Sequence, residues 1–262
     1  MTISNNDINI TILGSGTCVP SLKRTSCSVL IETGGKKLLF DSGAGVMRRL
    51  LETGVTIFDI DFIFYSHFHP DHTGELVPFL FSTKNPAEKQ RLTPLTITAG
   101  KGFKRFYNDL KTVYGHWIEL EEGLLNISEF DNKAADQRAY KAFTVLSTPV
   151  AHNPESIAYR IDSLQGKSVV YSGDTDFSTN LITLAQEADL LICESAFPDQ
   201  HKIPGHLTPS LAGSIAKQAN VRKLVLTHLY PECDLTDIRA QCRQEYDGPL
   251  IIAEDLMKIE IN

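Results

Sequence analysis

Four side chains of metal-binding type lie within the six-residue run His67-Phe68-His69-Pro70-Asp71-His72, directly after an apolar stretch. Alternate residues of an extended chain face the same side, so His67 and His69 should point in one direction. A turn at Pro70 lets Asp71 and His72 face a second position. Imidazole and carboxylate groups suit zinc, iron or manganese, and thiolate pairs typical of a closed structural zinc site are absent from the sequence. The run therefore predicts a catalytic metal site.

Two metal ions need more ligands than this run supplies, and three further candidates follow apolar strand-like stretches. His152 follows 143–150, Asp174 follows 168–173, and His228 follows 223–227. Each of the three, taken alone, fits equally well a buried residue that bonds to backbone groups. Their shared place at strand ends favours a common site.

The elements that position these residues are short apolar stretches alternating with helix-length patterns. Strands are expected at 8–13, 27–32, 37–40, 61–65, 95–98, 143–147, 157–161, 168–171, 190–193, 223–227, 250–253 and 256–261. Helices are expected at 44–53, 73–82, 101–112, 178–187, 208–219 and 234–246. So many strands exceed what one compact open sheet usually holds, so an α/β fold with two packed sheets and outer helices is predicted. The chain also divides into strand-rich halves, 1–140 and 141–262, with the ligands expected in the crevice between them.

Several passages resemble the metallo-β-lactamase superfamily and, within it, the ribonuclease Z family. They are Leu13-Gly-Ser-Gly-Thr-Cys-Val-Pro-Ser21, Leu39-Phe-Asp-Ser-Gly43, the HxHxDH run, Tyr171-Ser-Gly-Asp174-Thr, Glu194-Ser-Ala-Phe197, Gly205-His206-Leu-Thr208 and Leu226-Thr-His228. The resemblance implies a four-layered αββα sandwich over residues 1–262 as a single domain, with the active site at the edge between the two sheets. It also implies a homodimer.

The resemblance further implies two divalent metal ions, zinc above all, with manganese or iron as alternatives. His67, His69 and His152 would hold one ion; Asp71, His72 and His228 would hold the other; Asp174 would bridge them. Two cations about 3.5–4 Å apart activate water and stabilise the attacking and leaving oxygens at phosphorus. A phosphodiester is therefore the expected substrate.

The resemblance assigns catalytic roles to Asp71, His206 and Glu194. His206 would donate a proton to the leaving group, and Glu194 would orient its ring and raise its pKa. A helix-capping loop residue is the alternative for His206, and a solvated strand end is the alternative for Glu194. Asp41 is interpreted either as a helix N-cap or as a support for ligand histidines. The Gly14-Ser-Gly-Thr loop is expected to be a tight turn, and His116 and His201 to be surface residues.

The chain departs from ribonuclease Z where that family inserts a basic arm that binds transfer RNA. Only 21 residues, 153–173, separate His152 from Asp174, and their four charged members sum to zero. The formal net charge is −7, and Lys101, Lys104, Arg105 and Lys111 fit a solvated helix face. Binding to a phosphate backbone requires several Lys or Arg contacts. The leading hypothesis is thus a phosphodiesterase for a small or unstructured phosphodiester.

Three alternatives stay open. The first is a transfer-RNA 3′-processing endoribonuclease that uses another RNA-binding surface, and the second is a lactone or ester hydrolase with the same centre. The third is a metal-dependent binding module without catalysis. The five cysteines form no CxxC pair, and no leader or long apolar stretch is visible, so we expect reduced thiols and a cytoplasmic protein without membrane association.

Overall fold

The computed structural model describes residues 8–84 and 90–261, and its strands form two sheets of seven strands each. The first sheet has the order β14-β1-β2-β3-β4-β5-β6, with β14 (Met257–Ile261), β1 (Ile8–Gly14), β2 (Ser28–Thr33), β3 (Lys36–Phe40), β4 (Phe62–Phe64), β5 (Leu95–Gly100) and β6 (Leu125–Phe130). The second has the order β13-β12-β11-β10-β9-β8-β7, with β13 (Leu250–Ile252), β12 (Leu224–Thr227), β11 (Leu190–Glu194), β10 (Ser168–Tyr171), β9 (Ile157–Ser163), β8 (Phe143–Pro149) and β7 (Asp136–Ala139).

The two sheets repeat one pairing scheme. Across the first sheet the four strands from β14 to β3 pair antiparallel, and across the second sheet so do the four from β7 to β10. The remaining pairings of both sheets are parallel. Parallel strands end at the same edge of a sheet, which is where ligands bind in open α/β sheets. The scheme therefore gathers the ends of β3, β4, β10, β11 and β12 at one edge of the molecule.

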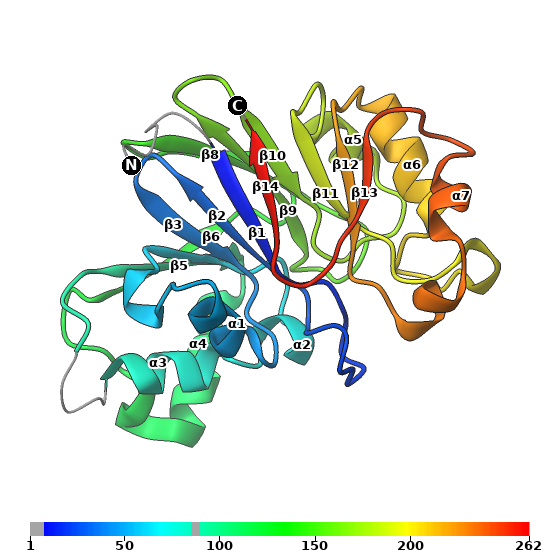
Figure 1. Ribbon diagram of the computed structural model, residues 1–262. Helices are drawn as coiled ribbons and strands as arrows, with labels where there is room; N and C mark the ends of the chain where they lie inside the picture. Colours follow the sequence, from blue (N-terminus) through cyan, green and yellow to red (C-terminus); the bar gives the residue numbers. More distant parts are fainter. Residues whose placement is uncertain (1–7, 85–89, 262) are drawn as a thin grey trace.

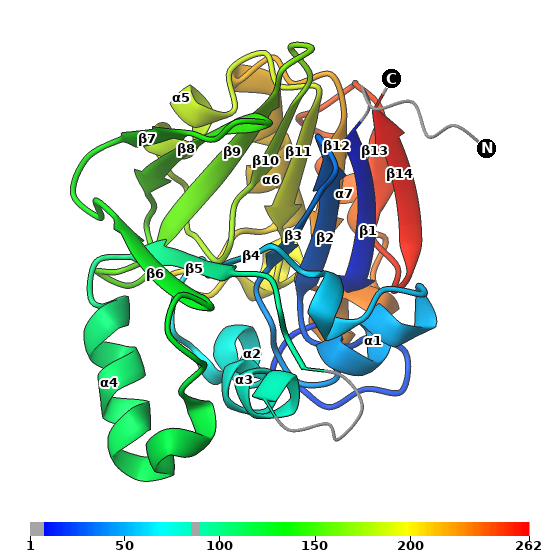
Figure 2. The ribbon, with the colours of Figure 1, turned by 90° about the vertical axis from the view of Figure 1, so that its left-hand side faces the viewer.

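Helices cover both outer faces of the paired sheets (Figure 1; Figure 2). Those over the first sheet are α1 (Val46–Glu52), α3 (Leu76–Lys84) and α4 (Phe103–Tyr114), and the short α2 (Pro70–Thr73) lies at the sheet edge. Those over the second sheet are α5 (Thr179–Leu184), α6 (Pro209–Gln218) and α7 (Ile238–Cys242). The order helix, sheet, sheet, helix confirms the predicted αββα sandwich.

Strand alternation explains how the layers pack. In β3, Leu38 and Phe40 belong to the core between the two sheets, whereas Leu39 faces the outer helices. Both faces of the strand are buried, so the strand reads as a continuous apolar run rather than as alternating polar and apolar residues. Aromatic rings fill the central core, where Phe40 stacks on Phe64 with ring centroids 4.9 Å apart and Tyr159 meets both rings edge-on.

Two strands, β6 and β7, were not predicted: β6 mixes polar with apolar residues, β7 is mostly polar, and most residues of both are only partly buried or exposed. The helix expected at 73–82 is interrupted between α2 and α3, where the Glu75 carboxylate accepts hydrogen bonds from Gly45 N and Met47 N at the start of α1. The helix expected at 234–246 is shorter, since a 3₁₀ turn covers Pro231–Leu235. The division into halves at residue 140 is wrong in two places, as β7 joins the second sheet and β14 returns to the first. That residues 1–262 form a single domain stays a prediction.

No helix among residues 8–84 and 90–261 is long and apolar enough to cross a membrane.

Candidate metal centre

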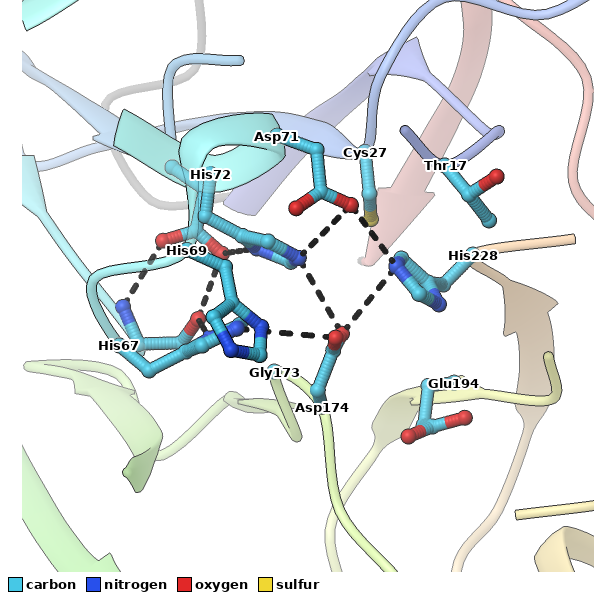
Figure 3. Close-up of polar contacts among 12 residues, drawn as sticks. Thr17, Cys27, His67, His69, Asp71, His72, Gly173, Asp174, Glu194 and His228 are labelled. Atoms are coloured by element: carbon cyan, nitrogen blue, oxygen red, sulfur yellow. Dashed lines mark hydrogen bonds and ion pairs between the residues drawn. The ribbon is translucent and has the colours of Figure 1, made fainter. Parts of the chain in front are cut away.

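All seven predicted ligands lie together at the edge where the strand ends of both sheets meet. The run from His67 to His72 follows β4 and includes α2, while His152, Asp174 and His228 follow β8, β10 and β12. Nitrogen and oxygen atoms of His67, His69, His152 and Asp174 lie within 4.8 Å of one another, and so do those of Asp71, His72 and His228. Figure 3 shows the rings from the first sheet facing Asp174 and His228 from the second.

Asp174 is the centre of this cluster. Its Oδ1 lies 3.3 Å from His72 Nε2 and 3.4 Å from His228 Nε2, and its Oδ2 lies 3.6 Å from His67 Nε2. The Asp71 carboxylate lies on the other side of His228, with Oδ2 3.6 Å from His228 Nε2. Burial alone would raise the pKa of Asp174, but His228, His72 and His67 outweigh it and hold the pKa well below its usual range. The group is therefore a carboxylate in contact with three rings.

Buried atoms without hydrogen-bond partners converge at this point. They are His67 Nε2, His72 Nε2, His228 Nε2 and Asp174 Oδ1. Buried polar atoms are almost always paired, and leaving one unpaired costs about 1–3 kcal/mol. Four such atoms facing one another fit a cation that accepts their lone pairs. The residues present thus match the divalent metal site that the sequence predicts.

In His67, His72 and His152 the opposite ring nitrogen is held by a protein acceptor, which directs the Nε2 lone pair inward, whereas His228 Nδ1 has no such partner. His72 Nδ1 donates to Asp41 Oδ2 at 2.8 Å, and His152 Nδ1 donates to the Gly205 carbonyl at 2.8 Å. Ser66 Oγ gives its only proton to Asp41, so it accepts from His67 Nδ1 at 3.0 Å. This arrangement of outer partners is typical of metal-bound histidines, whose tautomer it fixes.

The Asp41 carboxylate accepts several of these outer hydrogen bonds. Its buried carboxylate accepts hydrogen bonds from Ser66 N and Ser66 Oγ, both at 2.8 Å, from Tyr171 Oη at 2.7 Å, and from His72. The alternative role as a helix N-cap is wrong, because α1 begins after Gly45 and receives no side-chain cap from Asp41. Sequence reasoning missed Ser66 and Tyr171, which carry no local pattern. It also missed Asn153, whose Nδ2 lies 3.0 Å from His69 Nε2.

Unusual backbone conformations accompany the cluster. Asp41 and His228 have φ of 57° and 55°, in the left-handed region that costs most residues about 1–2 kcal/mol. Gly173 has φ of 57°, and a Cβ placed on it would lie 2.4 Å from Ser66 Cβ. The ends of β4 and β10 therefore approach so closely that only glycine fits before Asp174.

His206 and Glu194 form the pair expected beside the ligands. His206 Nδ1 donates to Glu194 Oε1 at 3.0 Å, and the His206 ring stacks against the His228 ring with centroids 5.6 Å apart. Burial favours a neutral ring, but Glu194 outweighs burial and raises the pKa of His206. Glu194 is itself 1% exposed and accepts from Thr175 N at 2.7 Å and Leu207 N at 3.1 Å. It is therefore a buried, fully bonded carboxylate and not a solvated strand end.

The remaining residues that the sequence analysis singled out lie outside the cluster around Asp174. His116 and His201 are exposed and lie outside the cluster. The tight turn expected at the Gly14 loop is wrong: Gly16 forms an isolated bridge with Ser26, and Gly16 N donates to Thr25 O at 2.8 Å, so this loop pairs with a distant part of the chain. Three of the four cations near α4 have acidic partners, namely Asp131, Asp109 and Glu119 for Lys101, Arg105 and Lys111. The five cysteines are free, as predicted.

Comparison with known proteins gives a consistent result. A model of the beta-lactamase superfamily domain matches residues 36–229. A ribonuclease Z of Halorubrum lacusprofundi is 27% identical, and the alignment covers 97% of each chain. The metallo-beta-lactamase fold protein YhfI of Bacillus subtilis superposes with a TM-score of 0.82 at 23% identity over 98% of this chain and 100% of the other. The short form of human tRNase Z superposes with a TM-score of 0.79 at 24% identity over 96% and 98%.

Proposed function

The chain belongs to the beta-lactamase superfamily and is a metal-dependent hydrolase, and from this premise we propose that it is a dinuclear phosphodiesterase acting on small or unstructured phosphodiesters. The observation that carries the proposal is the His206–Glu194 pair next to the cluster around Asp174. A hydrolase of phosphodiesters needs a group that protonates the departing oxygen, and this pair supplies one outside the ligand set.

We assign His67, His69 and His152 to one divalent ion and Asp71, His72 and His228 to the other, with Asp174 shared. Imidazole and carboxylate ligands suit zinc, and manganese and iron are the alternatives. When bound, two such ions would neutralise phosphate charge and lower the pKa of water. Asp71 Oδ2 lies 3.6 Å from His228 Nε2, so we assign this carboxylate both as a metal ligand and as a catalytic residue.

His206 is assigned as the proton donor to the leaving oxygen. Its Nδ1 proton is held by Glu194, so its Nε2 is the nitrogen available to the substrate. The raised pKa keeps more of the ring protonated near neutral pH, which is the form that can donate. Glu194 thereby fixes the tautomer and the position of the ring.

The segment between His152 and Asp174 supports a small or unstructured substrate. Residues 153–173 contain only β9, a short turn and β10, and two of their four charges, Arg160 and Asp162, pair with each other at 2.8 Å. Affinity for a structured RNA depends on several cationic contacts with its backbone. This hairpin provides no basic surface of that kind.

Processing of transfer-RNA 3′ ends is the second candidate, favoured by the 27% identity to a ribonuclease Z over nearly the whole chain. It requires another surface, or a second copy in a homodimer, to bind the RNA. Incubation with a precursor transfer RNA at low salt, with fresh zinc or manganese, decides it: cleavage at the discriminator nucleotide supports this candidate, and an intact precursor rejects it. Opening of an acyl-homoserine lactone, followed with a pH indicator, tests the third candidate, a lactone or ester hydrolase.

The direct test is hydrolysis of bis(4-nitrophenyl) phosphate by protein loaded with zinc, manganese or iron. The role of His206 is tested on a dinucleotide phosphodiester, because its departing alkoxide needs a proton whereas 4-nitrophenolate leaves without one. Replacing His206 with alanine should reduce kcat on the dinucleotide by about 10²–10⁴-fold, the usual contribution of a positioned acid. Asp71→Ala should reduce activity and metal content together. His201→Ala removes an exposed histidine and is the matched control. Turnover of the activated ester by wild-type protein no faster than by the Asp71 variant, or turnover of the dinucleotide no faster than by the His206 variant, would refute the proposal.

A further inference from the structure

The segment from Lys202 to His206 carries two groups of the site but belongs to no helix or strand. The Gly205 carbonyl accepts the Nδ1 proton of His152, and the next residue, His206, donates to Glu194. The position of this short segment therefore sets the direction of His152 Nε2 and of the His206 ring at the same time. Because the 202–206 segment has no helix or strand to fix it, its side-chain contacts must hold it in position.

Asp176 provides that contact. Its Oδ2 accepts from Lys202 Nζ at 2.8 Å and from Gly205 N at 2.9 Å, so one carboxylate oxygen binds both ends of the segment. Lys202 Nζ also donates to the Ile203 carbonyl at 2.9 Å, which tightens the turn.

Asp176 is itself anchored on the site side. Its backbone N–H donates to the Ala151 carbonyl at 2.8 Å, next to His152, and the two residues form an isolated antiparallel bridge. It follows Asp174 by two positions, and the intervening Thr175 N donates to Glu194. The carboxylate thus links the strand end that bears Asp174 to the segment that positions His152 and His206.

Gly205 lies so close to His152 that no side chain at position 205 can pack between them. Its φ is 88°, and a Cβ placed there would lie 3.2 Å from His152 Nδ1. A side chain here would push the His152 ring, so the segment meets His152 through the Gly205 carbonyl and through the His206 ring, whose centroid lies 5.0 Å from that of His152. The hydrogen bond from Gly205 N to Asp176 Oδ2 helps to hold the Gly205 carbonyl where it can accept the Nδ1 proton of His152.

We propose that Asp176, with Lys202, is a positioning residue that fixes the 202–206 segment and so holds His152 and His206 in their working orientations. The role rests on the proposed function, in which these rings are a metal ligand and a proton donor. Neither residue touches the substrate or the ions in this assignment. Loss of outer partners of this kind typically costs 10–100-fold in metal affinity or activity.

The first test compares zinc-loaded Asp176→Ala and Asp176→Asn with wild type, using a dinucleotide phosphodiester, whose departing alkoxide needs the proton of His206. Alanine should lower kcat by about 10–100-fold with KM nearly unchanged, because orientation and not substrate binding is lost. Asparagine should recover most of the activity, since its amide oxygen can still accept from Gly205 N. Asp109→Ala, which removes an exposed carboxylate on α4, is the control and should behave as wild type.

The second test measures the hydrogen bonds of the His152 and His206 rings by NMR and needs no catalytic activity. In ¹⁵N-labelled zinc-loaded protein, the Nδ1 protons of His152 and His206 should give slowly exchanging signals, and Asp176→Ala should broaden or shift both. Competition with a chelator should show zinc bound about 10–100-fold more weakly in the alanine variant. If wild-type protein cleaves no phosphodiester, the proposed function fails while these two readouts still decide the role of Asp176.

Unchanged kcat, unchanged ring signals and unchanged zinc affinity in Asp176→Ala would overturn the inference. Should that variant not fold, Lys202→Met decides instead. It keeps the contact between Asp176 and Gly205 and removes only the ammonium group, so it should show a smaller defect of the same kind. A Lys202→Met variant identical to wild type in all three measurements would also contradict the proposal.

Discussion

Replacing Asp41 with asparagine tests whether one buried carboxylate organises the metal centre. Asparagine has the same size and tolerates the left-handed backbone at this position, where φ is 57°. It turns one carboxylate oxygen into an amino group. Four donor contacts reach this carboxylate, from Ser66 N, Ser66 Oγ, His72 Nδ1 and Tyr171 Oη. In either orientation of the amide, at least one buried donor must therefore face an NH₂ group.

The size of the effect follows from these contacts. An orphaned buried donor costs about 1–3 kcal/mol, and a hydrogen bond loses about 1 kcal/mol when its acceptor is no longer charged. A neutral amide is easier to bury than a carboxylate, which offsets part of this loss. We expect the free energy of unfolding to fall by about 2–4 kcal/mol. Because His72 loses its charged partner, zinc affinity should also fall by about 10–100-fold.

Urea unfolding at two fixed free-zinc concentrations measures both quantities. Metal that binds only the folded chain adds stability with its concentration, so the difference between the two curves reports the affinity. Asp61→Asn is the control, because Asp61 bonds Lys36 and Lys37 far from the site and is partly exposed; it should cost about 1 kcal/mol or less. A loss below about 1 kcal/mol for Asp41→Asn, with unchanged zinc affinity, would refute the reasoning.

Three further predictions use the same unfolding assay. Gly173→Ala should destabilise the protein by about 3 kcal/mol, because its Cβ would overlap Ser66 and its φ is left-handed; a loss under about 1 kcal/mol contradicts this. Tyr171→Phe removes a buried hydrogen bond and should cost about 1–2 kcal/mol, whereas no change would mean that the hydroxyl is dispensable. Burial raises the pKa of Cys233 and of Cys242 from 9.0 to about 12, so stability should fall as pH rises across that interval, where the unfolded chain loses thiol protons first; a double alanine variant with the same slope would disprove it.

The cluster of candidate metal ligands could be predicted because its pattern is local. His67, His69, Asp71 and His72 fall within six positions at the end of an apolar strand. The remaining ligands could be found because apolar strands end in single histidines or aspartates, and strand ends meet at one edge in this class of fold. The resemblance added Glu194 and His206, which no spacing rule would have joined.

The outer contacts were not predictable, because they connect residues far apart in the chain. Asp41 is 25 residues from Ser66 and 130 from Tyr171, and neither partner stands out among the serines and tyrosines of the sequence. Asp41 itself fitted a helix N-cap equally well until the start of α1 was known. The strands β6 and β7 were missed for another reason, since their apolar residues are interrupted by polar ones or absent and so form no continuous apolar run like those of most other strands.

The pairing of β14 with β1 affects how the chain reaches its native state. Ile10 lies opposite Ile259, so β1 pairs with a strand that is synthesised after all the other described strands of both sheets. Until β14 leaves the ribosome, β1 presents an open edge whose backbone groups can pair with other chains. Contacts of such long sequence separation also slow folding. The nascent chain is therefore exposed to wrong strand pairing until β14 is available, although every proposed metal ligand precedes β14 in the sequence.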